Sequence, residues 1–124
     1  MDTTAAPAFL RIDKTTSKKD MEVYLLQAKK ASELLKALSH ETRLVILCLL
    51  AEGERSVSDL EEILAMPQAA VSQQLARLRF DRLVNARRDG RMIYYSLANQ
   101  EVTAVINMLH QLFCPPVRDG EDGS

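Results

Sequence analysis

The 124-residue sequence has no tryptophan, few glycines and prolines, and only two cysteines. Few turn-forming residues, together with abundant Leu, Ala, Glu, Lys and Arg, favour a mostly helical chain of one domain. The two cysteines, Cys48 and Cys114, are too few and too far apart for the disulfide scaffold of a small secreted protein. We therefore expect a cytoplasmic protein in which both cysteines are normally thiols.

Long apolar runs and a targeting segment are also lacking. The longest apolar run, residues 44–51, is far shorter than the roughly 20 residues that cross a membrane. The first residues, MDTTAAPAF, have no basic segment followed by an apolar one, so they do not resemble a secretory signal. We expect no membrane partner.

Excess charge of one sign is absent from the whole chain but present locally. The net charge is −1, yet six arginines and only two aspartates lie between residues 77 and 91. The last six residues, DGEDGS, are acidic by contrast. A nearly neutral protein with one basic segment suggests a localised anion-binding surface.

Apolar residues recur at helical spacing in the first two-thirds of the chain. The spacing predicts helices over residues 18–38, 40–52, 58–65 and 68–80. Ser39 is the expected N-cap of the second helix. The segment Ser58-Asp-Leu-Glu61 has the pattern of a capping box and is expected to open the third.

The periodicity then changes from that of a helix to that of a strand. The segment LVNARRDGRMIYYSL has β-branched and aromatic residues on both sides of Asp89-Gly90, a dipeptide that accepts the positive φ angles of a tight hairpin turn. It predicts strands over residues 83–88 and 91–97. Asn99 is the expected cap of a last helix that ends near residue 113. Four helices, a hairpin and a final helix predict a winged helix-turn-helix.

The predicted fourth helix carries side chains suited to binding DNA. Gln matches the adenine edge, Ser can bind a base or a phosphate, and small Ala residues permit close approach. The helix N-terminus favours phosphate. Arginines follow on the exposed side of this helix (Arg77, Arg79) and at the hairpin tip, where a wing meets phosphates or a minor groove. The predicted DNA-binding residues are Gln68, Ser72, Gln73, Gln74, Arg77, Arg87, Arg88 and Arg91.

Three segments carry a family pattern: ELLKALSHETRLVILCLLAEGERSVSDLEEIL, QAAVSQQLARLRFDRLV and RRDGRMIYYSL. They resemble the ArsR-type (ArsR/SmtB) winged-helix repressors over residues 33–112. The resemblance implies a mainly α fold with a β-hairpin, in the order ααααββα, and a homodimer formed through the first and last helices. It also implies a repressor that binds an inverted-repeat operator in double-stranded DNA and releases it when an inducer acts. Gln74 is a mild departure, because many members have His there.

With this resemblance the chain divides into three predicted regions. Residues 1–17 lack periodicity and are expected to form a flexible N-terminal arm. Residues 18–114 form the winged-helix DNA-binding and dimerisation domain. Residues 115–124 form a flexible acidic tail.

The metal sites of this family lack their ligands here, so we expect neither a metal nor another cofactor. Arsenic- and cadmium-type members have a Cys-Val-Cys motif before Asp-Leu in the third helix. This chain has Ser56-Val-Ser58-Asp-Leu, and hydroxyls are poor ligands for soft metals. Zinc- and nickel-type members use Asp and His pairs on the last helix, where the matching residues are Asn99, Glu101, Leu112 and Pro115.

The two cysteines fall in the predicted second helix and at the end of the last. This placement resembles the sulfide- or persulfide-responsive (BigR/SqrR-type) branch, in which cysteines of those helices act as a pair. The resemblance implies that reactive sulfur species convert Cys48 and Cys114 to a disulfide or a polysulfide-bridged form. Operator affinity then falls, and sulfur-detoxification genes are derepressed.

The residues around these thiols suggest an order of reaction. His110 precedes Cys114 by four residues, so the two share a helix face and an imidazolium there favours thiolate. We expect Cys114 to react first and Cys48, in an apolar run, to resolve.

Several alternatives remain open at this point. A cysteine in an apolar run is commonly core filling, which leaves a regulator with inert thiols. Metal-responsive and general redox-responsive repressors are two others. An enzyme such as a thiol peroxidase needs a second base or an oxyanion site beside the nucleophile, and only His110 is offered, so we expect no catalysis.

Overall fold

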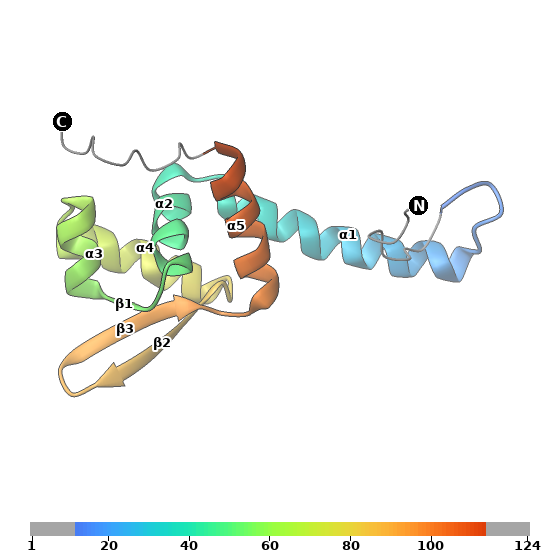
Figure 1. Ribbon diagram of the computed structural model, residues 1–124. Helices are drawn as coiled ribbons and strands as arrows, with labels where there is room; N and C mark the ends of the chain where they lie inside the picture. Colours follow the sequence, from blue (N-terminus) through green and yellow to red (C-terminus); the bar gives the residue numbers. More distant parts are fainter. Residues whose placement is uncertain (1–11, 114–124) are drawn as a thin grey trace. The chain divides into compact units, whose positions relative to one another are not determined.

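The computed structural model describes residues 12–113, and they form five helices and a small antiparallel sheet (Figure 1). The order is α1 (Lys18–Leu38), α2 (Glu41–Ala51), β1 (Arg55–Ser56), α3 (Val57–Leu64), α4 (Gln68–Phe80), β2 (Val84–Asp89), β3 (Met92–Leu97) and α5 (Gln100–Phe113). This is the predicted winged helix-turn-helix, with one short strand added. The described chain divides into two compact units between Lys36 and Ala37.

The first unit contains most of α1 and the turn before it. Asp13 Oδ1 accepts a hydrogen bond from the N–H of Thr15 at 2.8 Å, and hydrogen bonds with this threonine lower the pKa of the Asp13 carboxyl. Ser17 Oγ accepts from the N–H of Asp20 at 3.0 Å, which is an N-cap bond. This cap explains why the helix begins at residue 18, as predicted.

The second unit has an aliphatic core centred on α2. This helix contacts α4, α5 and β3. The fully buried side chains are aliphatic except for one serine: Ile46, Leu47, Leu60, Leu75, Leu78, Ile106, Val71 and Ser56. The buried positions on α4 are Val71, Leu75 and Leu78, whose spacing of three and four residues places them on one face of the helix.

Two predicted helix starts are wrong. The N-cap of α2 is His40 and not Ser39, and the His40 side chain makes no capping bond. The N-cap of α3 is Ser56, whose Oγ accepts from the N–H of Asp59 at 3.1 Å. Ser58 therefore lies inside the first turn of α3. The cause is β1, because Ser56 pairs with Tyr94 of β3 and is held extended until the helix begins.

The sheet has the strand order β1-β3-β2, and β2 and β3 form the wing. Asp89 pairs with Met92, so the turn consists of Gly90 and Arg91, and Gly90 has φ +66°. Glycine at the first central position is typical of a type II′ hairpin turn. The expectation that Asp89 also takes a positive φ was wrong, and both strands begin one residue later than predicted. Arg91 consequently lies in the turn itself.

Asp81 links α2 to the end of α4. Its Oδ2 lies 3.2 Å from Arg77 Nε and 3.8 Å from Arg43 Nη1. The Arg43 side chain is only 14% exposed, and its Nε has no hydrogen-bond partner among the described residues. Asp81 is therefore the counterion that balances the charge of Arg43.

We expect Asp81→Ala to lower the free energy of unfolding by about 2 kcal/mol, because it leaves the Arg43 charge largely buried without a counterion. Chemical denaturation measures this, and the Tm should fall by about 10 °C. Glu62→Ala is the control, since Glu62 is an exposed carboxylate of α3 and its removal should cost less than about 0.5 kcal/mol. Equal stability of the two variants would contradict the role given to Asp81.

Candidate nucleic-acid interface and thiol site

The helix-turn-helix consists of α3, a turn over residues 65–67, and α4. The turn begins with Ala65, which has a left-handed conformation with φ 53° and ψ 44°. Leu60 of α3 and Leu75 of α4 are both fully buried, and the two helices are in contact. The opposite side of α4 is thereby left open to solvent.

The exposed side of α4 presents three of the predicted base-reading residues. Gln68, Ser72 and Gln73 are exposed, whereas Gln74 is half-buried. Gln68 and Ser72 are four residues apart and lie on one flank of the helix. Arg77 lies on the other side, where it is bound to Asp81. The structure thus gives Gln68, Ser72 and Gln73 the freest access to a base edge.

The wing arginines have different surroundings. Arg88 and Arg91 are exposed and have no ion pair within residues 12–113. Arg87 instead donates from Nε and Nη2 to the two carboxylate oxygens of Glu54, at 2.7 and 2.8 Å. Its guanidinium carbon also lies 4.7 Å from the centre of the Tyr94 ring. Arg87 therefore binds the wing to the loop before β1.

At neutral pH both members of the Glu54–Arg87 pair are charged. The hydrogen bonds from Arg87 lower the pKa of the Glu54 carboxyl, and the same bonds raise the pKa of Arg87. A carboxyl with a lowered pKa stabilises the fold above its ordinary pKa, and this contribution is lost as the pH falls through the lowered value. Sequence reasoning missed Glu54, because its partner lies 33 positions away and is brought close only by the pairing of β1 with β3.

Cys48 is half-buried on α2, next to the fully buried Leu47. Cys114 lies outside the described residues, so its distance from Cys48 is not given by the structure. It follows directly on Phe113, the last residue of α5, and α5 packs against α2. His110 is exposed in the last turn of α5.

Of the positions that hold metals in members of the family that the sequence resembles, those within residues 12–113 have structural roles or are exposed here, and Pro115 lies outside the described residues. Ser56 caps α3, and Asn99 Oδ1 accepts from the N–H of Val102 at 2.9 Å, which confirms Asn99 as the cap of α5. Ser58 and Glu101 are exposed. Within residues 12–113 no cluster of three or more His, Cys, Asp or Glu is arranged to hold a metal ion. None of the helices described is long and apolar enough to span a membrane.

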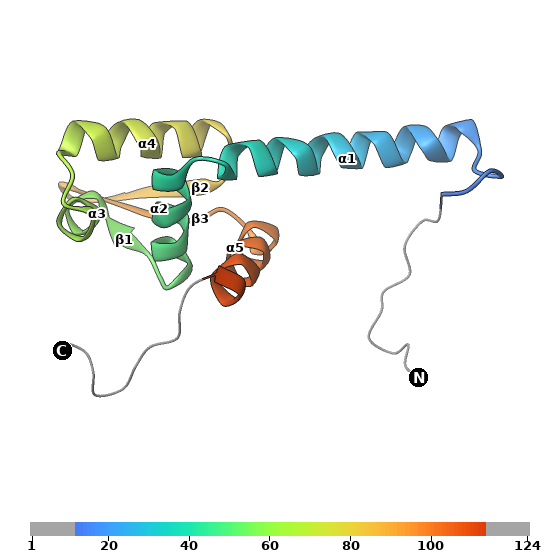
Figure 2. The same cartoon turned by 90° about the horizontal axis from the view of Figure 1, so that it is seen from above.

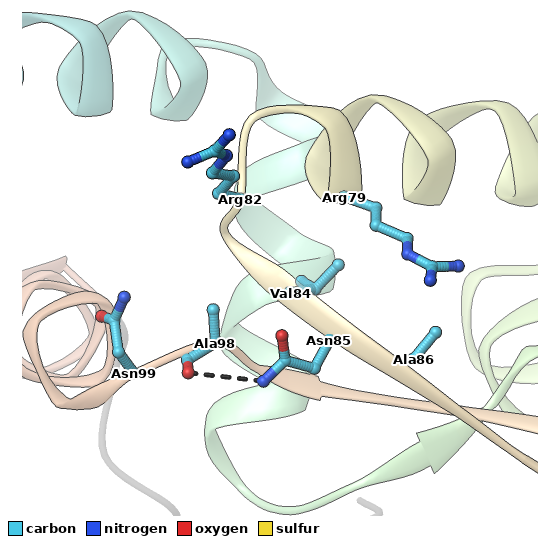
Figure 3. Close-up of a pocket in the computed structure, with 7 residues that line it drawn as sticks. All are labelled: Arg79, Arg82, Val84, Asn85, Ala86, Ala98 and Asn99. Carbon is cyan, nitrogen blue, oxygen red and sulfur yellow. Dashed lines mark hydrogen bonds between the residues drawn. The ribbon is translucent and has the colours of Figure 1, made fainter.

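A pocket that the sequence did not predict lies between the end of α4 and the start of the wing. It is lined by Arg79 and Arg82, by residues of β2, and by the residues that lead into α5 (Figure 3). In both Figure 1 and Figure 2 the tip of the wing and the N-terminus of α4 lie toward the side of the second unit that carries α3, and Figure 1 shows the tip apart from that helix. The polar flank of α4, the pocket and the wing tip together form one candidate nucleic-acid interface.

Comparison with known proteins gives a consistent result. The family model described as "Bacterial regulatory protein, arsR family" matches residues 40–86. The transcriptional activator HlyU of Vibrio cholerae is 48% identical over 85 residues, which cover 68% of this chain and 79% of that protein.

Two solved structures of similar proteins extend the match to the fold. The crystal structure of the transcriptional repressor BigR from Xylella fastidiosa has a TM-score of 0.68 and 38% identity, and covers 82% of this chain and 100% of that one. A homodimeric winged helix-turn-helix DNA-binding domain from Mycobacterium bovis, Mb0332, has a TM-score of 0.64 and 31% identity, and covers 81% of this chain and 89% of that one.

Proposed function

Because the chain belongs to the ArsR family of bacterial regulatory proteins, we propose that it is a homodimeric repressor that binds an inverted-repeat operator and releases it when reactive sulfur species modify Cys48 and Cys114. The observation that carries the DNA-binding part is the joint surface of α4 and the wing. It combines exposed amide and hydroxyl groups (Gln68, Ser72, Gln73) with two arginines at the wing tip, Arg88 and Arg91. Amide groups can read base edges while the arginines contact phosphates.

Exposed apolar side chains on α1 and α5 support a homodimer. Val23, Leu25, Leu26 and Leu35 of α1 are each at least half exposed, as are Met108, Leu112 and Phe113 of α5. Large apolar side chains exposed in numbers on a helix are typical of an interface. A two-fold dimer also places two α4 helices for the two halves of an inverted repeat. The similarity to the homodimeric Mb0332 domain agrees with this proposal.

Operator binding is tested with a duplex selected from random sequences by the purified protein, with affinity measured by fluorescence anisotropy. We expect Gln73→Ala to weaken binding about tenfold and to relax base preference at one position of each half-site, because a bidentate amide contact is lost. The matched control is Gln100→Ala, which removes an exposed amide at the start of α5. Failure of the wild-type protein to select any sequence would contradict the proposed function.

The proposed sensing step is a balanced thiol exchange. One cysteine thiolate attacks the outer sulfur of a persulfide RSSH. The S–S bond of the persulfide breaks, the RS group leaves as RSH, and the outer sulfur stays on the cysteine as a Cys-SSH group. The second cysteine thiolate then attacks the inner sulfur and displaces hydrogen sulfide, so that a disulfide forms. A second persulfide that delivers its sulfur before closure gives a trisulfide instead. The two thiols are oxidised and the persulfide sulfur is reduced.

The position of Cys48 supports this chemistry in two ways. The residue is half-buried and not fully buried, so it is not enclosed as the neighbouring Leu47 is. Cys48 also lies on the helix that packs against α5, whose end directly precedes Cys114 in the chain. A direct disulfide needs Cα atoms within about 7 Å, whereas an inserted sulfur chain spans a larger separation.

Intact mass after treatment with glutathione persulfide, compared with hydrogen peroxide, tests the inducer. With the persulfide, and not with hydrogen peroxide, we expect a bridged product that is two hydrogens lighter than the reduced protein, apart from any inserted sulfur atoms. In Cys48→Ser this bridged product should be absent, and only unbridged sulfur adducts of the remaining cysteine should form. Loss of two hydrogens with both reagents would indicate a general redox-responsive repressor. Stoichiometric binding of Zn(II) or As(III) that abolishes operator affinity would indicate a metal-responsive one.

A further inference from the structure

Arg82 has a backbone conformation that favours glycine. Its φ is +62°, and it directly follows the C-cap of α4. The N–H of Leu83 bonds to the carbonyl of Leu78 at 2.9 Å, and the N–H of Arg82 bonds to the carbonyl of Arg79 at 3.0 Å. These two bonds define a Schellman motif, in which the left-handed position is usually glycine because a Cβ is disfavoured there. Glycine would be less strained than arginine at position 82, yet the chain has arginine there.

The side chain of this residue lines a pocket that has no acidic lining residue. The pocket has a volume of about 500 Å³ and lies between the end of α4, the first half of β2 and the residues that lead into α5 (Figure 3). Its cations are Arg79 and Arg82, both exposed, and neither forms an ion pair within the described part of the chain. Two positive charges beside a pocket without a carboxylate attract an anion.

Hydrogen bonds within the fold orient the two asparagine side chains that line the pocket. Asn85 Nδ2 donates to the carbonyl of Ala98 at 3.4 Å, and Asn99 Oδ1 accepts the capping bond of α5. These bonds occupy the Ala98 carbonyl and the Asn99 Oδ1, which are acceptors, and the only charged side chains that line the pocket are the two guanidinium groups. Strain at Arg82 and the unpaired charge of its side chain are independent observations that point to the same function.

The direction of the two side chains limits the kind of anion. Figure 3 shows the guanidinium groups pointing away from each other, that of Arg79 toward Ala86 and that of Arg82 away from it. One small oxyanion does not bridge groups arranged in this way, whereas a polyanion with successive charges does. Arg79 lies seven residues after Ser72, on the flank of α4 that also carries Gln68. A DNA strand that follows this flank therefore reaches Arg79 and then Arg82.

We propose that the pocket formed by Arg79 and Arg82 holds consecutive phosphates of the operator DNA backbone, between the base-reading flank of α4 and the wing. The inference rests on the proposed DNA-binding function and adds to it a phosphate site at the C-terminal end of α4. Arg82 is the anchor of this site, and its strained backbone is retained because glycine has no guanidinium.

Arg82→Gly separates binding from stability. We expect operator affinity to fall about tenfold at moderate salt, and the slope of log K against log salt to decrease in magnitude by about 1, as for the loss of one phosphate contact. The Tm should equal or exceed that of the wild type, because glycine relieves the left-handed strain. Arg82→Gln retains the strain and removes the charge, so it should lose the same affinity.

Two further variants serve as controls. Ala65 is the second non-glycine residue with a positive φ within residues 12–113. Ala65→Gly therefore shows how much the Tm rises when left-handed strain is relieved away from the pocket. Lys14→Gln removes an exposed positive charge outside the pocket, and operator affinity should change less than twofold.

The outcomes distinguish this inference from the function on which it rests. If the wild type binds its operator and both Arg82 variants bind equally well at every salt concentration, the pocket proposal is overturned and the proposed function stands. A titration of the free protein with pyrophosphate, followed through the side-chain amide resonance of Asn85, tests for a small ligand. Saturation at micromolar pyrophosphate, with unchanged operator affinity in Arg82→Gly, would overturn the DNA assignment in favour of a free anion.

Discussion

Replacing Cys48 with serine is expected to leave operator affinity within about twofold of the wild type and to abolish the loss of affinity that persulfide causes. Cys48 lies on α2, outside the α4 and wing surface, so its thiol makes no contribution to the DNA interface that we propose. A hydroxyl is far less nucleophilic than a thiolate, so the serine cannot close a sulfur bridge, even though Cys114 can still take up sulfur from the persulfide. Anisotropy titrations with and without glutathione persulfide measure the difference.

The stability of this variant needs its own control. Leu47 and Leu50, near Cys48 on α2, are buried, and a hydroxyl placed beside such a core costs about 1–2 kcal/mol when it lacks a partner. Cys48→Ala carries no polar atom and should give the same unresponsive phenotype. Cys114→Ser should also be unresponsive. A Cys48→Ala protein that still releases DNA on persulfide treatment would show that the cysteine pair is not the sensor.

Reversing the charge of both Arg88 and Arg91 to glutamate is expected to weaken operator binding by about 100-fold or more near physiological salt. Each lost phosphate contact lowers affinity through lost counterion release, and each new carboxylate adds repulsion from the DNA. The slope of log K against log salt should decrease in magnitude by about 2. The fold should be unaffected, because both residues are exposed and form no ion pair within residues 12–113.

The control for this experiment changes the same total charge elsewhere. Lys14→Glu combined with Lys18→Glu reverses two exposed positive charges at the start of the described chain. Its effect on affinity should be less than about fivefold. An equal loss in both double variants would mean that net charge, and not the wing, determines affinity.

The sequence predicted those parts of the fold that depend on local signals. The apolar spacing of α1 and α4 and the amide of Asn99 gave correct starts for three helices, because a helix and its cap are determined within a few residues. The misplaced start of α3 has a non-local cause. Ser56 pairs with Tyr94 in a two-residue strand, and two residues carry no periodicity that a sequence pattern can detect.

The same distinction applies to the candidate site. The exposed face of α4 follows from its buried stripe, so the exposure of Gln68, Ser72 and Gln73 was predictable. The pairing of Arg87 with Glu54 was not, because it depends on the sheet that brings the two residues together. The strain at Arg82 was also hidden, since a φ angle cannot be read from a sequence that has arginine where glycine is usual.

The ion pair between Glu54 and Arg87 attaches the wing to the chain at a pivot point close to the end of α2, so a rotation at this point moves the wing tip. Glu54 lies three residues beyond the end of that helix, and the turn at Gly90 lies three residues beyond Arg87. Three strand residues span about 10 Å, so a rotation of about 10° at the pivot displaces the tip by roughly 2 Å. That displacement exceeds the range over which a hydrogen bond to a phosphate persists. In the DNA complex that we propose, a small change in the orientation of the helix that carries Cys48 would therefore be enough to disengage the wing tip.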